Sequence, residues 1–222
     1  MDVVKPTFST ALRGFLPGLT AAVTLLVMAA APATLATDAT TAGSAEAGQA
    51  KSVTCAACHG MDGNSLNPEW PNIAGQHEAY LIKALQTFRS GGRQSVLMAG
   101  MAMPLTDADI RDLAAYFAKQ KPKGNVADRS LVAAGERLYR GGNKDAGVPA
   151  CLACHGPTGR GNPAAGWPVI AGQHATYAAA QLVAYRSKQR ATDGDTQMMR
   201  NVASALSDDD IKAVTSYIQG LR

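Results

Sequence analysis

The sequence predicts an all-helical protein made of two copies of one small domain in tandem. Apolar and aromatic residues recur at helical spacing in several segments, and no segment alternates apolar and polar residues as a half-buried strand does. The segment Trp70–His77 returns as Trp167–His174, 97 residues later, and Leu105–Ile110 returns as Leu206–Ile211. A repeat of this length indicates duplicated structural units.

Each copy is expected to contain three helices. A first short helix begins near residue 45 or 130 and leads into a cysteine motif, and a second spans 77–90 or 174–188. The third follows Thr106 or Ser207, each a hydroxyl residue with an acid three positions later, which is the capping-box pattern. The apolar stripes after these caps are expected to form the core: Ile110, Leu113, Tyr116, Phe117, Ile211, Val214, Tyr217 and Ile218.

Composition breaks mark the boundaries of the copies. Pro122, Gly124 and several lysines define a linker at 121–130, so we expect domains at 45–120 and 131–222. The polar, Ala/Thr/Gly-rich segment 37–44 is expected to be flexible. The chain has a formal net charge of only +4 and lacks a lysine-rich run, which argues against nucleic acid as a partner.

The N-terminus has the pattern of a secretory signal peptide. Lys5 and Arg13 precede an uncharged stretch with an apolar centre and small residues near position 36. An uncleaved membrane anchor is the alternative, and the prolines Pro17 and Pro32 disfavour it. We therefore expect residues 1–36 to be removed on export to the periplasm, with peripheral membrane association as a further possibility.

All four cysteines lie in two Cys-x-x-Cys-His motifs. Cys55 and Cys58 precede His59, and the same pattern returns 96 residues later as Cys151, Cys154 and His155. Two thiols one helical turn apart can add to the vinyl groups of a haem while the histidine binds the iron. Zinc sites need further ligands nearby, and thioredoxin-like pairs follow a strand, so neither alternative fits. The sequence predicts two covalent haem c groups.

The second axial ligand of each iron is predicted from the repeat. The first copy offers Met98, Met101 and Met103, and the second offers Met198 and Met199. When the copies are aligned on their capping boxes, only Met98 and Met199 coincide, eight residues before the cap. These two are the predicted ligands, with Met101 and Met198 as runners-up. Another repeated pair could also bind iron but is expected to cap helices or lie at the surface: His77 and His174.

Each half resembles a class I cytochrome c, and the tandem pair resembles the dihaem cytochrome c4 family from about residue 45 to the C-terminus. The similarity rests on the paired haem motifs, the repeated Ala-Gly-Gln-His, and the segments 139–142, 149–151, 193–196 and 216–221. The resemblance implies His and Met ligation of both irons. It also implies that the carbonyls of Pro71 and Pro168 accept hydrogen bonds from the proximal histidines.

The same resemblance implies an electron carrier and not an enzyme. Its expected partners are membrane respiratory complexes, with electrons passing from a quinol-oxidising complex toward a terminal oxidase. A cytochrome subunit of a flavocytochrome sulfide dehydrogenase is the alternative. A dihaem peroxidase is a weaker one, because it needs an open iron site. Between residues 128 and 222 there are 11 basic and 8 acidic residues. The second domain is therefore expected to dock on acidic partner surfaces, or to raise the potential of its own haem, because positive charge disfavours the ferric form.

Overall fold

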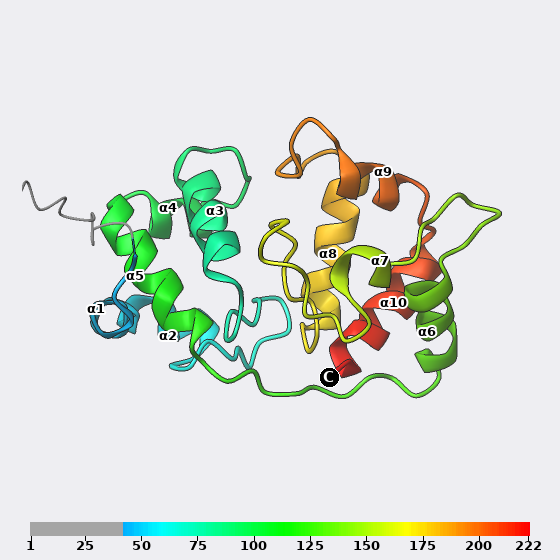
Figure 1. The fold of residues 1–222 in the computed structure, drawn as a ribbon, viewed down its shortest axis with the longest axis horizontal. Coiled ribbons are helices and arrows are strands. Elements are labelled where there is room, and N and C mark those ends of the chain that lie inside the picture. Colours follow the sequence, from blue (N-terminus) through cyan, green and yellow to red (C-terminus); the bar gives the residue numbers. More distant parts are fainter. Residues whose placement is uncertain (1–41) are drawn as a thin grey trace, which may run out of the picture. The chain divides into compact units, whose positions relative to one another are not determined.

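The computed structural model describes residues 42–222, all of which belong to one compact unit. The predicted signal peptide and residues 37–41 of the predicted flexible segment lie outside the described residues. The first half contains α1 (Ala45–Lys51), α2 (Val53–His59), α3 (Glu78–Arg89), α4 (Val96–Ala102) and α5 (Asp107–Ala118) (Figure 1). The second half contains α6 (Val132–Gly141), α7 (Leu152–His155), α8 (Ala175–Arg186), α9 (Met198–Ser204) and α10 (Asp208–Gly220).

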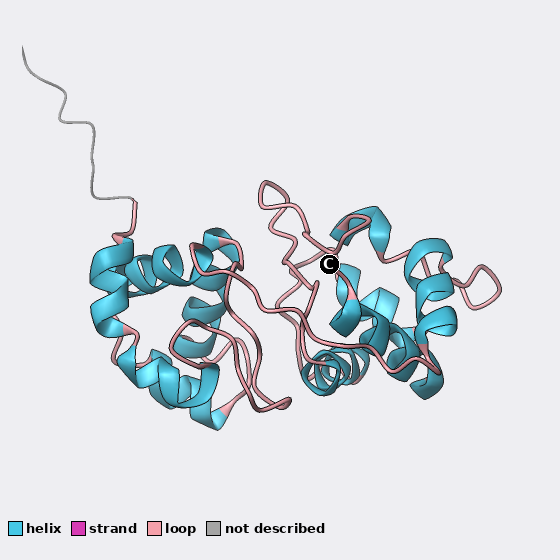
Figure 2. Cartoon of the chain, turned by 90° about the horizontal axis from the view of Figure 1, so that it is seen from below, coloured by secondary structure: helices cyan, strands magenta, loops and turns pink. Residues whose placement is uncertain are grey.

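The all-helical prediction is confirmed for residues 42–222. Helices and loops account for this part of the chain in Figure 2, and β-type pairing is limited to three isolated bridges. None of the helices described there is both long and apolar enough to cross a membrane.

Both predicted capping boxes form. The Thr106 hydroxyl accepts a hydrogen bond from Asp109 N at 3.1 Å, and the Asp109 carboxylate accepts one from Thr106 N at 2.9 Å. Ser207 and Asp210 repeat this arrangement at the start of α10, with both distances at 3.1 Å. The caps satisfy N–H groups that the helix itself leaves without partners, and they fix the starting point of each C-terminal helix.

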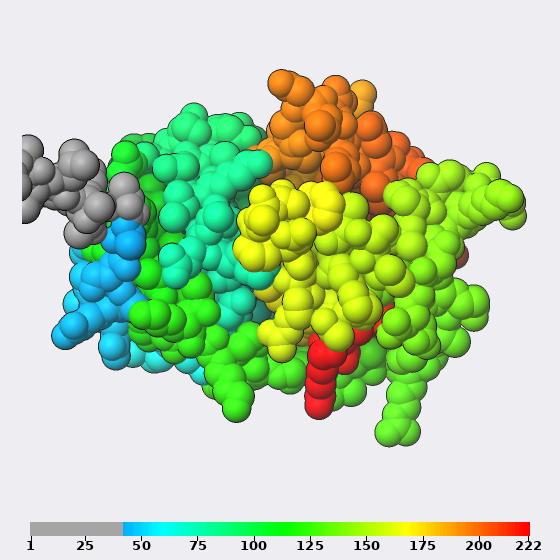
Figure 3. Space-filling view, in the orientation of Figure 1, coloured from blue at the N-terminus to red at the C-terminus, as the bar shows by residue number. Residues whose placement is uncertain are grey.

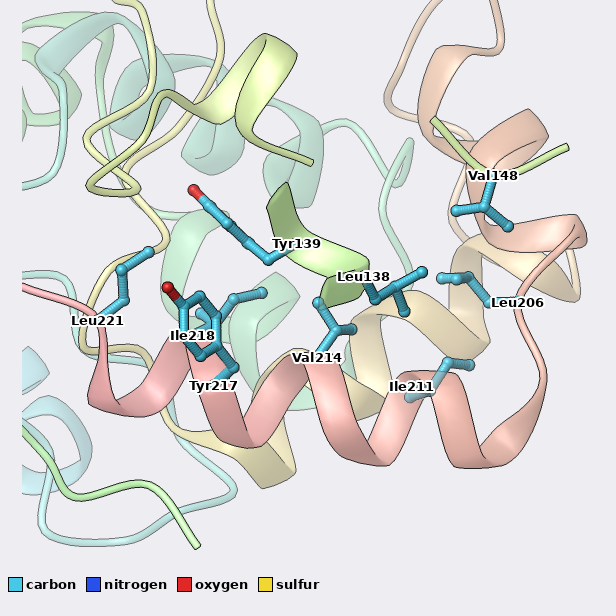
Figure 4. Close-up of a cluster of buried hydrophobic side chains, with 9 residues drawn as sticks. All are labelled: Leu138, Tyr139, Val148, Leu206, Ile211, Val214, Tyr217, Ile218 and Leu221. Carbon is cyan, nitrogen blue, oxygen red and sulfur yellow. The ribbon is translucent and has the colours of Figure 1, made fainter. Parts of the chain in front are cut away.

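Each half forms its core against its last helix. In the second half, α6 packs against α10, and the buried side chains of Leu138, Tyr139, Val214 and Tyr217 meet there (Figure 4). In the first half, α1 packs against α5, and Leu113 and Phe117 of α5 are buried against α3. The predicted apolar stripes of α5 and α10 therefore face the core.

Two local features differ from the sequence-based expectation. The first helix of the second half does not run into the cysteine motif, because α6 ends at Gly141 and Gly142 adopts a φ of +70°. A loop follows before α7 begins, and the backbones of Asn143 and Val148 pair within it. Two further short helices, α4 and α9, were not expected from the sequence; each spans only seven residues, too few for a clear helical period.

The linker forms hydrogen bonds with both halves. The side-chain oxygen of Asn64 accepts a hydrogen bond from Lys123 N at 2.7 Å, and Asn125 donates one to Gly172 O at 2.9 Å. In Figure 3 the cyan-green surface of the first half lies directly against the yellow surface of the second.

Candidate haem-binding sites

The cysteine motifs lie on short helices that end at the histidine. Cys55 and Cys58 are on α2, one turn apart, whereas Cys151 is the N-cap of α7 and Cys154 lies within it. Directly after each histidine, Gly60 and Gly156 adopt φ values of +77° and +76° and stop the helix. All four thiols are half-buried. Each motif thus presents two thiols and an imidazole from a single turn of backbone.

Both motif histidines have their ring orientation fixed by a backbone carbonyl. His59 is 7% exposed and its Nδ1 lies 2.9 Å from the oxygen of Pro71, while Nδ1 of His155 lies 3.1 Å from the oxygen of Pro168. A carbonyl only accepts, so Nδ1 carries the proton. Burial lowers the pKa of both histidines, which favours the neutral ring. In that ring Nε2 has a free lone pair, as an iron ligand requires.

The first thiol of each motif lacks the lowered pKa of an activated redox cysteine. Burial raises the pKa of Cys55, and it raises the pKa of Cys151 to about 11. Reactive thiol pairs have lowered pKa values. Among residues 42–222, no three side chains of His, Cys, Asp or Glu gather as a metal site would require. The thiols suit thioether formation with a haem better than either alternative.

The candidate methionine ligands lie on the two short helices α4 and α9. Met98 is on α4 and Met199 is on α9, and both are half-buried. The runners-up are more exposed, at 41% for Met101 and 38% for Met198. Two thiols, an imidazole with a free Nε2 and a sheltered thioether on a separate helix form a donor set that fits haem c.

The repeated histidines outside the motifs occupy N-cap positions but cap nothing with their side chains. Nε2 of His77 lies 2.8 Å from the oxygen of Arg160, and Nε2 of His174 lies 2.9 Å from the oxygen of Ser65. Each bond crosses to the other half. His174 is 7% exposed, so the expectation of a surface role is wrong for this residue. These contacts explain why the pair repeats without any need for iron ligation.

Two buried arginines also join the halves and were not identified from the sequence. The guanidinium of Arg93 stacks on Phe88 and donates to the Tyr177 hydroxyl at 2.7 Å. Arg190 donates to the Tyr80 hydroxyl at 3.0 Å. Burial alone would raise the pKa of Tyr80, but the two nearby guanidinium groups outweigh it and lower that pKa. Tyr80 therefore lies at the contact between the halves.

Comparisons with known proteins agree with this geometry. The family model described as cytochrome c matches residues 45–121 and 132–222. A cytochrome c4 from Stutzerimonas stutzeri is 51% identical over 180 residues, covering 77% of this chain and 86% of the relative. A crystal structure of reduced recombinant cytochrome c4 from Pseudomonas stutzeri has a TM-score of 0.80 at 50% identity, covering 82% of this chain and all of the other. A thiosulfate dehydrogenase electron acceptor from Thiomonas intermedia (strain K12) is 38% identical, covering 76% of this chain and 78% of that protein.

Two tandem helical domains, each with a haem-attachment motif, define a dihaem c-type cytochrome. The chain belongs to the cytochrome c family and, within it, to the dihaem cytochromes c4. It carries two covalently attached haem c groups and is an electron carrier, not an enzyme.

Proposed function

We propose that His59 and Met98 bind the iron of the first haem, and that His155 and Met199 bind the iron of the second. The observation that carries this assignment is the bond from each histidine Nδ1 to a backbone carbonyl, which leaves Nε2 free. Burial of the two methionines relative to their neighbours supports the sixth ligand. A thioether ligand favours the ferrous state, so both haems should have fairly positive potentials.

The proposed domains are residues 45–120 and 131–222, joined by the linker 121–130. A signal peptide at 1–36 and a flexible segment at 37–44 would precede them. Haem c is attached outside the cytoplasm, so we place the mature protein in the periplasm. Its partners would be redox proteins, including respiratory complexes at the membrane surface.

The physiological role is proposed to be electron transfer from a quinol-oxidising complex to a terminal oxidase. Relatives named cytochrome c4 support the electron-transfer part of this role. A second candidate is acceptance of electrons from a thiosulfate dehydrogenase, favoured by the relative from Thiomonas intermedia. Stopped-flow reduction by each purified donor distinguishes the two roles. The rate with the natural donor should saturate as the donor concentration rises, and it should fall as the ionic strength rises.

The ligand assignment is tested by adding carbon monoxide to the dithionite-reduced protein. Two six-coordinate irons leave the Soret band unchanged. A shift that accounts for half of the haem would reveal one open site and bring the peroxidase alternative forward.

Two methionine variants sharpen the assignment. Met98→Ala should create a CO-binding site on the first haem and abolish half of the near-infrared band that marks Met–iron bonding. Met101→Ala is the matched control, because it removes a methionine from the same helix, and it should leave both signatures intact. The opposite pattern would make Met101 the ligand.

A further inference from the structure

A matched pair of glutamines joins the two halves. Oε1 of Gln173 accepts a hydrogen bond from Asn72 N at 2.9 Å, and Nε2 of Gln173 donates one to Asn72 O at 2.9 Å. Gln76, at the equivalent position of the repeat, makes the same two bonds to Val169 N and O, both at 2.9 Å. Each glutamine therefore docks on the backbone of one residue in the opposite half.

The backbone groups that the glutamines bind belong to the peptide units that hold the motif histidines. Asn72 N and Pro71 O are the two ends of one peptide unit, and Pro71 O accepts the bond from His59 Nδ1. The peptide between Pro168 and Val169 stands in the same way between His155 and Gln76. Each peptide links a histidine of one half to a glutamine of the other.

The orientation of each glutamine amide is determined by its neighbours. Oε1 of Gln76 also accepts from His77 N at 3.0 Å, and Oε1 of Gln173 accepts from His174 N at 3.0 Å. Backbone N–H groups only donate, so in each glutamine the amide oxygen, and not the nitrogen, must face these N–H groups. Gln76 is 7% exposed, so bulk water has little access to replace its contacts.

We propose that Gln173 is a positioning residue for His59, and Gln76 for His155, so that each half tunes the haem potential of the other. The inference rests on the proposed ligation of iron by these histidines. A peptide whose N–H donates to a glutamine becomes a stronger acceptor at its oxygen, because hydrogen bonds in a chain polarise one another. The histidine then donates more electron density to iron, which favours the ferric state.

The test is the reduction potential of each haem in Gln173→Met, with the haem resonances assigned by NMR. The potential of the first haem should rise, and the Nδ1 proton of His59 should shift. The second haem, which shares a half with the changed residue, should move less. Gln76→Met should produce the mirror result. A larger shift at the haem of the mutated half, or equal shifts at both, would overturn the inference.

A control variant separates this effect from general loosening of the contact. His77→Ala removes the bond between Nε2 and Arg160 O but touches neither peptide unit, so both potentials should stay close to those of the unchanged protein. If His77→Ala matches Gln76→Met, loosening explains the shifts and the inference fails.

A second variant keeps the test decisive if Gln173→Met does not fold. Gln173→Glu retains the oxygen that accepts from Asn72 N and should not raise the potential of the first haem; a rise would contradict the inference. The proposed histidine ligation is tested separately in the unchanged protein by NMR, because an imidazole bound to a haem iron shows strongly shifted ring resonances. Unshifted ring resonances for His59 and His155 refute the ligation, whereas shifted resonances with unmoved potentials in the glutamine variants refute only the role of the glutamines.

Discussion

Gly135 permits the close crossing of α6 and α10. A Cβ added there would lie 2.3 Å from Ala213 O and 2.6 Å from the Cβ of Tyr217. Both are rigid parts of α10, so Gly135→Ala must push the helices apart. The alanine gains about 1 kcal/mol of helix propensity, whereas overpacking a core costs about 1–3 kcal/mol. At a crossing this tight the upper end applies, which gives a net loss of about 1–2 kcal/mol.

The matched control is on the same helix. Gly141 is exposed, and a Cβ added there meets nothing within 4 Å. Gly141→Ala should therefore stabilise the protein by about 0.5 kcal/mol through propensity alone. Thermal unfolding of the holoprotein, followed by circular dichroism and by the Soret band, measures both.

The expected result is a difference in sign between the two variants. For a domain of about 90 residues, the length of the proposed second domain, each kcal/mol lost in unfolding free energy lowers the thermal midpoint by about 4–8 °C. Gly135→Ala should accordingly lower the midpoint by about 4–16 °C, and Gly141→Ala should raise it slightly. If the two variants behave alike, the tight crossing does not limit stability and the reasoning is wrong.

Three further predictions concern stability in the second half. The side chain of Asp193 is 5% exposed. Hydrogen bonds from Arg200 outweigh its desolvation and lower the pKa of this carboxyl, and Asp193→Asn should cost about 1.5–3 kcal/mol. This stability is present above the ordinary carboxyl pKa and is lost as the pH falls through the lowered one, so acid unfolding curves of the variant and the parent should converge at low pH. Lys188 adopts a φ of +64° at the position where the first half has Gly91 at +77°. Lys188→Gly should relieve about 0.5–1 kcal/mol of backbone strain and so raise the denaturation midpoint. A lower midpoint would contradict this reasoning. Ser207→Ala removes one cap and should cost about 1 kcal/mol in guanidinium unfolding; no change would mean that water replaces the hydroxyl.

Features that depend on local sequence could be predicted. The haem motifs, the capping boxes and the apolar stripes of α5 and α10 are patterns within a few residues, and local backbone geometry translates them directly into structure. The internal repeat provided two copies of the same domain that could be aligned with each other, and this alignment selected Met98 and Met199 from five candidate methionines. Their burial relative to neighbouring methionines supports that choice.

Features that depend on the contact between the halves could not be predicted. Gln76 and Gln173 stand in the repeated Ala-Gly-Gln-His, but the repeat alone does not say that each reaches a backbone peptide about a hundred residues away. Arg93 and Tyr80 have no local pattern that marks them as interface residues. By itself the sequence determined the duplication, the cofactor and the local caps. Only the tertiary structure decided how the halves meet, because that contact joins side chains to distant backbone groups that carry no sequence signature.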